Sequence, residues 1–246
     1  KNPNILVILI DDAGYNDFGF MGSKEMQTPN IDALTSEGVV FTDAHVAATV
    51  SSPSRACLIT GRYGHRFGYE CNLSDRTNGL PLEEETIAEV FKTNGYRTAA
   101  IGKWHLGSRD EQHPNNRGFD LFYGMKAGGR DYFYNEKKSD RPGDERNLLL
   151  NDRQVKFEKY LTDAFSEKAV EFINESSQPF MMYLAYNAVH TPMQATDEDM
   201  AKFEGHPRQK LAAMTYALDR GVGTVIRGLK DSGKFDNTLI FFLSDN

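Results

Sequence analysis

The sequence predicts an α/β protein with a mostly parallel, mixed sheet flanked by helices, and three features of the chain support this. Short aliphatic runs of strand length recur along the chain, beginning with Asn4–Ile10. Segments with apolar residues at helical spacing separate these runs. Polar residues follow several of the runs directly, as they do where ligands bind at the carboxyl edge of a parallel sheet. Such alternation of strands and helices is typical of a sheet covered by helices.

The first half of the chain is predicted to hold three strands and three helices. The strands are expected at residues 4–10, 39–42 and 98–101, and the helices at 29–37, 53–60 and 82–94. The first strand is aliphatic at nearly every position, which indicates burial on both faces. Each helix is followed by a glycine (Gly38, Gly61 or Gly95), a residue that ends helices without strain.

The second half continues the same alternation. A hairpin is expected at residues 148–157, helices near 161–172 and 211–229, and strands at 180–186 and 239–243. In the first of these helices Leu161, Phe165 and Phe172 recur at helical spacing. The chain contains no internal repeat. With 246 residues, of which 39% are hydrophobic, it can bury one sizeable core in a single domain.

Composition narrows the classes of function and partner. The net charge is −7 and no long basic run occurs, so a nucleic-acid partner is not expected. The longest apolar run is strand-sized, so no membrane span is expected. Cys57 and Cys71 fit either a disulfide in an exported protein or free thiols, and leave the compartment open. Lys1 stands directly before a strand, so we expect any targeting segment to have been trimmed.

Residues 51–62 carry the strongest functional signal. Ser52 is predicted to cap a helix that begins at Pro53, which places Ser51 just outside the helix N-terminus. Backbone N–H groups and the helix dipole favour an anion there, and Arg55 can reach the same anion one turn along. An ordinary helix start with a solvated arginine fits this segment equally well. The chemical interpretation is a nucleophile that attacks an anionic ester.

Further polar residues follow the predicted strands. Asp11 and Asp12 follow the first strand, and Asp245 and Asn246 follow the last. Three carboxylates and an amide oxygen suit Ca²⁺, or less well Mg²⁺, whereas the histidine pairs and cysteine clusters typical of zinc sites do not occur. Lys103, His105 and His190 lie after other strands. Each residue alone also fits a turn cap or a solvated loop, but their shared placement predicts one site.

Two long motifs resemble the signatures of the type I sulfatases. Residues 51–62 match a pattern of Cys or Ser, any residue, Pro-Ser-Arg, a variable stretch and Thr-Gly-Arg, and residues 95–105 match the second signature. Residues 4–12, 117–120 and 236–246 are also similar to the family. The resemblance covers nearly the whole chain. It implies an alkaline phosphatase-like fold and hydrolysis of sulfate esters through formylglycine.

The resemblance also implies roles for individual residues. Ser51 would be oxidised to formylglycine by a dedicated maturase, and Arg55 and Lys103 would neutralise the reacting oxygens. His190 would protonate the leaving oxygen, and His105 would remove the proton that lets sulfate depart. The implied metal ligands are Asp11, Asp12, Ser51, Asp245 and Asn246. Arg55→Ala and His105→Ala are therefore expected to abolish turnover and to leave the fold largely intact.

Two departures from the family pattern bear on these expectations. Position 51 is serine, whereas cysteine dominates in the family; serine-type members occur in bacteria, and an engineered Cys→Ser change would look the same. Family members also continue for roughly as long again. Residues 1–246 are therefore interpreted as an N-terminal catalytic domain without the smaller C-terminal domain or a further active-site lysine. An exported location, the bacterial periplasm or the cell surface, is expected.

The substrate is expected to be a sulfated carbohydrate, such as a glycosaminoglycan or a mucin glycan. The candidate sugar-binding residues follow the nucleophile helix, and a solvated loop explains them equally well; they are His65, Arg66, Glu70 and Asn72, with Tyr69 beside them. Arg130 and Asp131 are weaker candidates. Two other functions remain open: a phosphate or phosphonate ester hydrolase of the same superfamily, and a non-catalytic glycan-binding protein in which Ser51 is unmodified.

Overall fold

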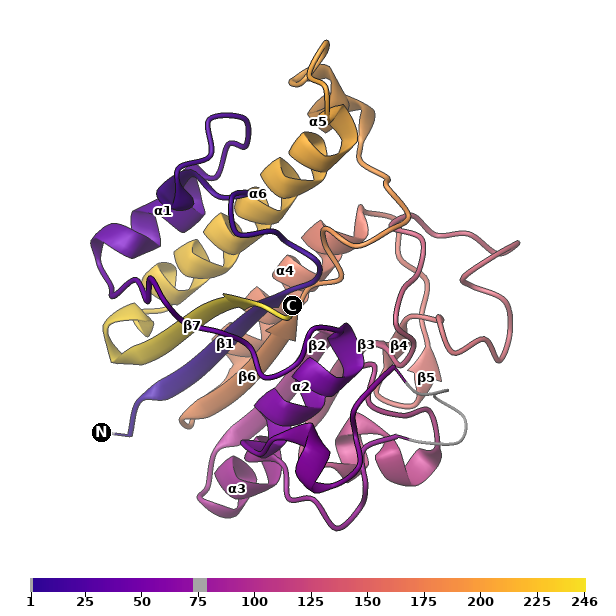
Figure 1. Cartoon of the computed structure of the whole chain (residues 1–246). Coiled ribbons are helices and arrows are strands. Elements are labelled where there is room, and N and C mark those ends of the chain that lie inside the picture. Colours follow the sequence, from indigo (N-terminus) through magenta and orange to yellow (C-terminus); the bar gives the residue numbers. More distant parts are fainter. Residues whose placement is uncertain (1, 73–78) are drawn as a thin grey trace.

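A computed structural model describes residues 2–72 and 79–246, and a seven-stranded sheet runs through its centre (Figure 1). The strands are β1 (Asn4–Ile10), β2 (Arg97–Lys103), β3 (Leu121–Met125), β4 (Leu149–Leu150), β5 (Arg153–Gln154), β6 (Phe180–Ala185) and β7 (Thr238–Ser244). Their order is β5-β4-β3-β2-β6-β1-β7. Strands β3, β2, β6, β1 and β7 run parallel to one another, whereas β4 pairs antiparallel with β3 and β5 pairs antiparallel with β4. The predicted mostly parallel α/β sheet is confirmed.

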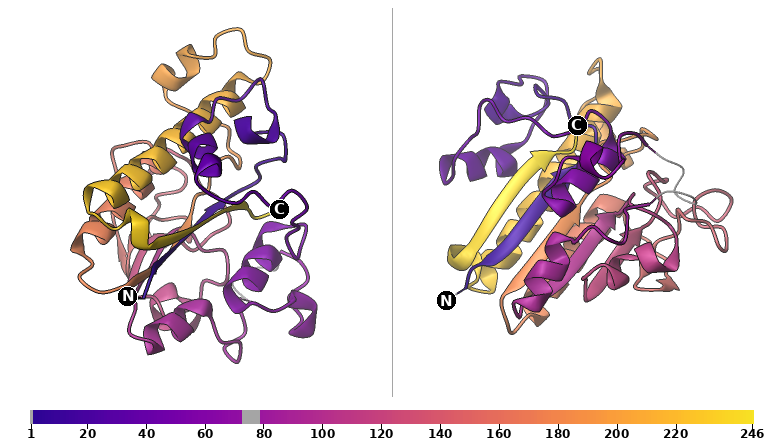
Figure 2. Two further views of the ribbon diagram at one scale, coloured as in Figure 1. Left: turned by 90° about the vertical axis from the view of Figure 1, so that its left-hand side faces the viewer. Right: turned by 60° about the horizontal axis from the view of Figure 1, so that its bottom comes forward.

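Helices cover both faces of this sheet (Figures 1 and 2). One face carries α1 (Pro29–Ser36), α4 (Leu161–Glu175) and α6 (Gln209–Asp231), and the other carries α2 (Ser51–Thr60) and α3 (Ile87–Thr93). Helix α5 (Asp197–Ala201) packs on α6, and short 3-10 turns lie at Gly19–Met21, Gly64–Arg66, Asp110–Gln112, Pro114–Asn116 and Phe235–Asn237. All seven residues of β1 are buried, because alternate side chains enter the two cores on either side of the sheet.

Some predicted elements differ from the structure. The strand expected at residues 39–42 is wrong: these residues form an irregular loop in which Val39 and Phe41 are 79% and 75% exposed. The helix expected from residue 82 begins at Ile87, because Thr86 and Glu89 form a capping box there. The predicted hairpin is present as β4 and β5, but it extends the main sheet beside β3, a strand that the sequence analysis missed.

Close packing of β2 against β6 positions Lys103 at the carboxyl edge of the sheet. A Cβ on Gly102 would lie 1.9 Å from the carbonyl oxygen of Ala185, and Gly102 has a φ of 107°. Only glycine therefore fits at this point, directly before Lys103. Within the part of the chain that the structure describes, none of the helices combines the length and apolar character needed to cross a lipid bilayer.

Candidate active site

Ser51 lies at the first turn of α2, facing the carboxyl ends of β1 and β7. Its Oγ is 2.5 Å from Asp245 Oδ2 and 3.2 Å from Asp11 Oδ1. Arg55 donates a hydrogen bond from Nε to the same oxygen at 3.0 Å. Ser51 and both carboxylates are buried. The structure therefore joins the predicted nucleophile to residues from opposite ends of the chain.

The start of α2 differs from the prediction that Ser52 caps it. Helix α2 begins at Ser51, and its N-cap residue, Val50, supplies no side-chain bond. The Ser52 hydroxyl instead lies 2.6 Å from the Tyr69 hydroxyl and donates to the carbonyl of His105 at 2.8 Å. Asn72 Oδ1 accepts the Ser52 N–H at 3.0 Å. The helix start is thus held by a distant amide side chain.

Arg55 is a fully buried cation at the centre of the cluster, in contrast to the solvated arginine that a plain helix start would present. Its Nη2 lies 2.8 Å from Asp245 Oδ2 and 3.3 Å from Asp11 Oδ1. Its Nη1 donates to the carbonyl of Lys103 at 3.1 Å. Burial opposes the charge, but the Tyr183 hydroxyl and the two carboxylates raise the pKa of Arg55 above its ordinary value. The guanidinium is therefore a permanent charge facing Ser51.

Lys103 provides a second buried cation. Its Nζ donates to Asp11 Oδ2 at 2.7 Å, and both side chains are fully buried. Burial and the positive charge of Arg55 lower the pKa of Lys103. Burial raises the pKa of Asp11 despite these two cations. At Asp245 burial acts in the same direction, but Arg55 and the Ser51 hydrogen bond outweigh it and lower the pKa.

Three carboxylates meet here in an arrangement that fits a metal ion. The side-chain oxygens of Asp11, Asp12 and Asp245 lie within 4.8 Å of one another. Asn246 Nδ2 donates to Asp12 Oδ1 at 2.9 Å, and the Asp12 N–H lies 3.3 Å from Asp245 Oδ1. A cation held between these oxygens would offset the repulsion and the burial penalty that raises the pKa of Asp11. The all-oxygen donor set suits a hard divalent cation.

Two histidines, His105 and His190, flank the cluster, and their surroundings differ. His105 is largely buried, and its Nδ1 has no hydrogen-bond partner among residues 2–72 and 79–246. Burial lowers the pKa of His105 to about 3, and the charges of Lys103 and Arg55 add to this effect. His190 Nδ1 lies 2.6 Å from the carbonyl of Thr191, so this nitrogen must be the donor. Nε2 of His190 faces Asp12 Oδ2 at 3.6 Å.

The buried, neutral His105 is expected to make stability depend on pH. The unfolded histidine binds a proton below about pH 6.5, whereas the folded one stays neutral down to about pH 3. The unfolded state holds more protons in this window, so the free energy of unfolding falls by about 1.4 kcal/mol for each pH unit lost. The stability difference between wild type and His105→Gln should therefore shrink as the pH falls. Denaturant titrations measure this, and a constant difference would contradict it.

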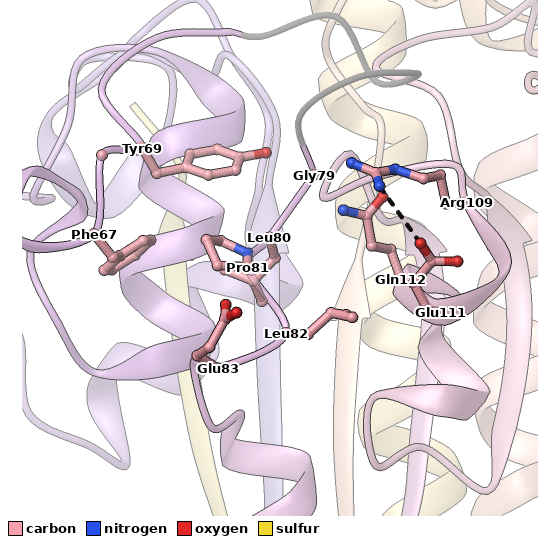
Figure 3. A pocket seen from close by; sticks show the side chains of 11 residues that line it. Phe67, Tyr69, Gly79, Leu80, Pro81, Leu82, Glu83, Arg109, Glu111 and Gln112 are labelled. Carbon is pink, nitrogen blue, oxygen red and sulfur yellow. Dashed lines mark ion pairs between the residues drawn. The ribbon is translucent and has the colours of Figure 1, made fainter.

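The candidate sugar-binding residues do not form one compact group. His65, Arg66 and Glu70 are exposed on the loop after α2, whereas Tyr69 is buried and Asn72 bonds to the helix start. A pocket of about 340 Å³ opens beside this loop (Figure 3). Arg109, Glu111 and Gln112 lie across it from Phe67. Of the predicted residues only Tyr69 lines this pocket.

Arg130 and Asp131, the weaker candidates, are committed to internal partners. Arg130 is 2% exposed, and its Nη2 binds both carboxylate oxygens of Asp140 at 2.8 and 2.9 Å. Asp131 is 6% exposed and accepts a hydrogen bond from Ser139. Neither side chain is available to a sugar in this structure. Because Arg130 and Asp140 both lie in a long polar stretch of the sequence, their burial as an ion pair was not predicted.

Three residues that complete the site, Tyr183, Gly128 and Gly129, were not predicted from the sequence. The Tyr183 hydroxyl, in the middle of β6, lies 3.5 Å from Arg55 Nη1; a tyrosine within an otherwise apolar strand is the signal that could have found it. Gly128 and Gly129 lie against the two histidine rings. Their adjacency in a glycine-rich loop after β3 gave only a weak signal.

The mostly parallel sheet, with Ser51 on a helix at its carboxyl edge, defines an α/β protein of the alkaline phosphatase-like class. The chain belongs to the sulfatase family: the family model described as Sulfatase matches residues 3–246. It is 34% identical over 300 residues to uncharacterized sulfatase YdeN of Escherichia coli, covering 99% of this chain and 52% of that protein. It is 37% identical over 275 residues to arylsulfatase G of Mus musculus, covering 99% and 51%.

Solved structures agree with this assignment. The crystal structure of Ps i-CgsB matches with a TM-score of 0.94 and 45% identity, covering 100% of this chain and 59% of that one. A second structure of Ps i-CgsB, in complex with k-i-k-neocarrahexaose, matches with a TM-score of 0.93 and 44% identity. The chain spans about half the length of the curated relatives that it matches.

Proposed function

We propose that the protein hydrolyses sulfate esters of carbohydrates, with formylglycine derived from Ser51 as its nucleophile. The observation that carries the proposal is the position of the Ser51 oxygen between Asp245, Asp11 and Arg55. A buried oxygen beside two carboxylates and a cation is suited to the transfer of an anionic group. Membership of the sulfatase family supports sulfate as that group.

Oxidation of Ser51 supplies the nucleophile. A maturase, using an electron acceptor of its own, removes two hydrogens from the side chain, and water adds to the resulting aldehyde to give a geminal diol. One hydroxyl gives its proton to Asp245, which lies 2.5 Å from the oxygen on residue 51, and its oxygen bonds to sulfur while the bond from sulfur to the sugar oxygen breaks. His190 gives the proton that the departing sugar oxygen requires, which is general acid catalysis.

The second hydroxyl completes the cycle. His105, neutral because burial lowers its pKa to about 3, takes the proton from this hydroxyl. The carbon–oxygen bond to sulfate then breaks, sulfate leaves and the aldehyde returns. An unmodified serine has no second hydroxyl, so its sulfate ester would persist and the enzyme would stop after one turnover.

Charge neutralisation is assigned to two cations and a bound metal ion. Arg55 and Lys103, both buried and held by Asp11, stabilise the charge that develops on the sulfuryl and diol oxygens. We propose Ca²⁺ as the metal. Its proposed ligands are Asp11, Asp12, Asp245, Asn246 and the oxygen on residue 51. When bound, this ion would withdraw charge from the sulfate group and lower the pKa of the attacking hydroxyl.

The proposed substrate is a sulfated carbohydrate. Two relatives support this class: N-acetylgalactosamine-6-sulfatase of Homo sapiens, at 31% identity, and Ps i-CgsB, of which one structure contains a neocarrahexaose. His65, Arg66 and Glu70, exposed on the loop after α2, are proposed to contact the sugar. Because sulfated glycans of this kind lie outside cells, the proposal includes export to the periplasm or the cell surface.

Matched esters distinguish this function from phosphate or phosphonate hydrolysis. With Ca²⁺ present, the intact matured protein is expected to hydrolyse an aryl sulfate faster than the matching aryl phosphate by orders of magnitude. The clustered oxygen ligands of Asp11, Asp12 and Asp245, without histidine, support this expectation. Initial rates of alcohol release measure both reactions. Faster release from the phosphate ester would overturn the sulfatase proposal.

A further inference from the structure

The segment after β3 passes against both histidine rings of the site. A Cβ added to Gly128 would lie 2.6 Å from Nε2 of His105 and 2.7 Å from its Cε1. A Cβ added to Gly129 would lie 3.3 Å from Cε1 of His190 and 3.4 Å from its Nδ1. Neither glycine has a positive φ, so space rather than backbone conformation limits the side chain here. A Cβ at position 128 would require the His105 ring to move, and one at position 129 would press on the His190 ring by a few tenths of an ångström.

A buried ion pair anchors this segment directly after the glycines. The guanidinium of Arg130 binds Asp140 through Nη2, and its Nη1 donates to the carbonyl of Arg146 at 2.8 Å. The same group lies over the ring of Phe157, 4.7 Å from its centroid. Asp140 also accepts the N–H of Asn135 at 2.7 Å. A buried charge held by this many partners leaves the adjoining main chain little freedom.

Tyr132 ties the same segment to the loop that carries His190. Its hydroxyl lies 2.6 Å from the carbonyl of Asn187 and 2.8 Å from that of His190. Its N–H donates to Gln194 Oε1 at 2.8 Å. His190 is therefore held at its backbone by Tyr132 and at its ring by the carbonyl of Thr191, and Gly129 leaves the space that this ring occupies.

We propose that Gly128 and Gly129 are positioning residues for the reaction, Gly128 for His105 and Gly129 for His190, and that the Arg130–Asp140 ion pair fixes both. The inference rests on the proposed function and deepens it. Gly129 lies beside His190, which is proposed to protonate the departing sugar oxygen, and Gly128 lies beside His105, which is proposed to start the release of sulfate. Gly129 therefore affects departure of the sugar, whereas Gly128 affects release of sulfate.

Alanine at each glycine tests this division in the intact, matured protein with Ca²⁺ present. Gly129→Ala should lower turnover of a sugar sulfate roughly tenfold or more and that of a nitrophenyl sulfate much less, because a nitrophenolate departs without a proton. Gly128→Ala should lower the steady-state rates of both esters roughly tenfold or more and leave a rapid first release of nitrophenol. Gly228→Ala is the control: its Cβ would crowd Val170, a half-buried residue of α4, where α4 packs against α6.

The outcomes separate this inference from the proposed function. If wild-type protein hydrolyses neither ester, the proposed function fails. If wild type is active but both variants match Gly228→Ala, or lose activity equally on the two esters with no rapid first release, the positioning roles are overturned. Should an alanine variant fail to fold, Arg130→Lys serves instead. It keeps the charge but loses the two-oxygen contact with Asp140. Because this ion pair is proposed to fix both glycines, the variant should lower the steady-state rates of both esters and keep a rapid first release of nitrophenol; equal losses without that first release would contradict the inference.

Discussion

Ser51→Ala is expected to lower turnover of a sulfate ester by about 10⁴-fold or more while the protein remains folded. Alanine cannot become formylglycine, so the variant has no nucleophile. The structural cost is small, because Arg55 and Asp245 keep their direct ion pair when the hydroxyl is removed. Loss of the serine hydrogen bonds should cost about 1 kcal/mol.

Steady-state rates and thermal melting, measured on the same preparation, test this prediction. Ser166→Ala is a matched control, since it removes a buried hydroxyl of helix α4 that hydrogen-bonds to Tyr186, outside the site. The control should lose a similar amount of stability and keep its turnover. Retention of more than roughly a hundredth of wild-type turnover by Ser51→Ala would show that another group is the nucleophile.

Arg55→Ala is expected to abolish turnover and also to destabilise the fold strongly. The sequence led us to expect a largely intact fold, but the structure shows Arg55 fully buried between Asp11 and Asp245. Removing one partner of a buried ion pair leaves uncompensated charge and costs about 3–5 kcal/mol. For a chain of this length the melting temperature should fall by on the order of 10 °C.

Added Ca²⁺ should stabilise Arg55→Ala more than it stabilises wild type, because the carboxylates then lack their main cation. Melting curves with and without Ca²⁺ measure this difference. Lys92→Ala is the control: its ion pair with Asp120 lies at the surface and should be worth about 1 kcal/mol or less. A wild-type melting temperature for Arg55→Ala would contradict the buried cluster.

Much of the fold could be predicted from the sequence because its strongest patterns reflect burial. The aliphatic run of β1 is buried on both faces, and the helical spacing of Phe165 and Phe172 marks the inner face of α4. The strand predicted at residues 39–42 was wrong because a local pattern does not show whether a strand has a partner. Val39 and Phe41 favour a strand locally, yet no described strand pairs with them, and a strand needs a partner for its backbone groups.

Site residues that directly follow a strand could be predicted from the sequence. Residues whose role depends on tertiary packing could not. Asp11, Asp245 and Lys103 meet because the carboxyl ends of parallel strands share one edge. No local pattern shows that Asn72 holds the start of α2, because this contact joins residues 20 positions apart. The burial of Arg130 was missed for the same reason: its partner Asp140 lies in a polar loop that looks solvated.

The central claim is that residue 51 acts as formylglycine, and peptide mass spectrometry across Ser51 tests it most directly. The sample should be the intact protein purified from its native host, since maturation depends on a partner enzyme. Loss of two hydrogens at position 51 is the result we predict. An unmodified serine there would rule out multiple turnovers by this chemistry and favour a protein that binds sulfated glycans without hydrolysing them.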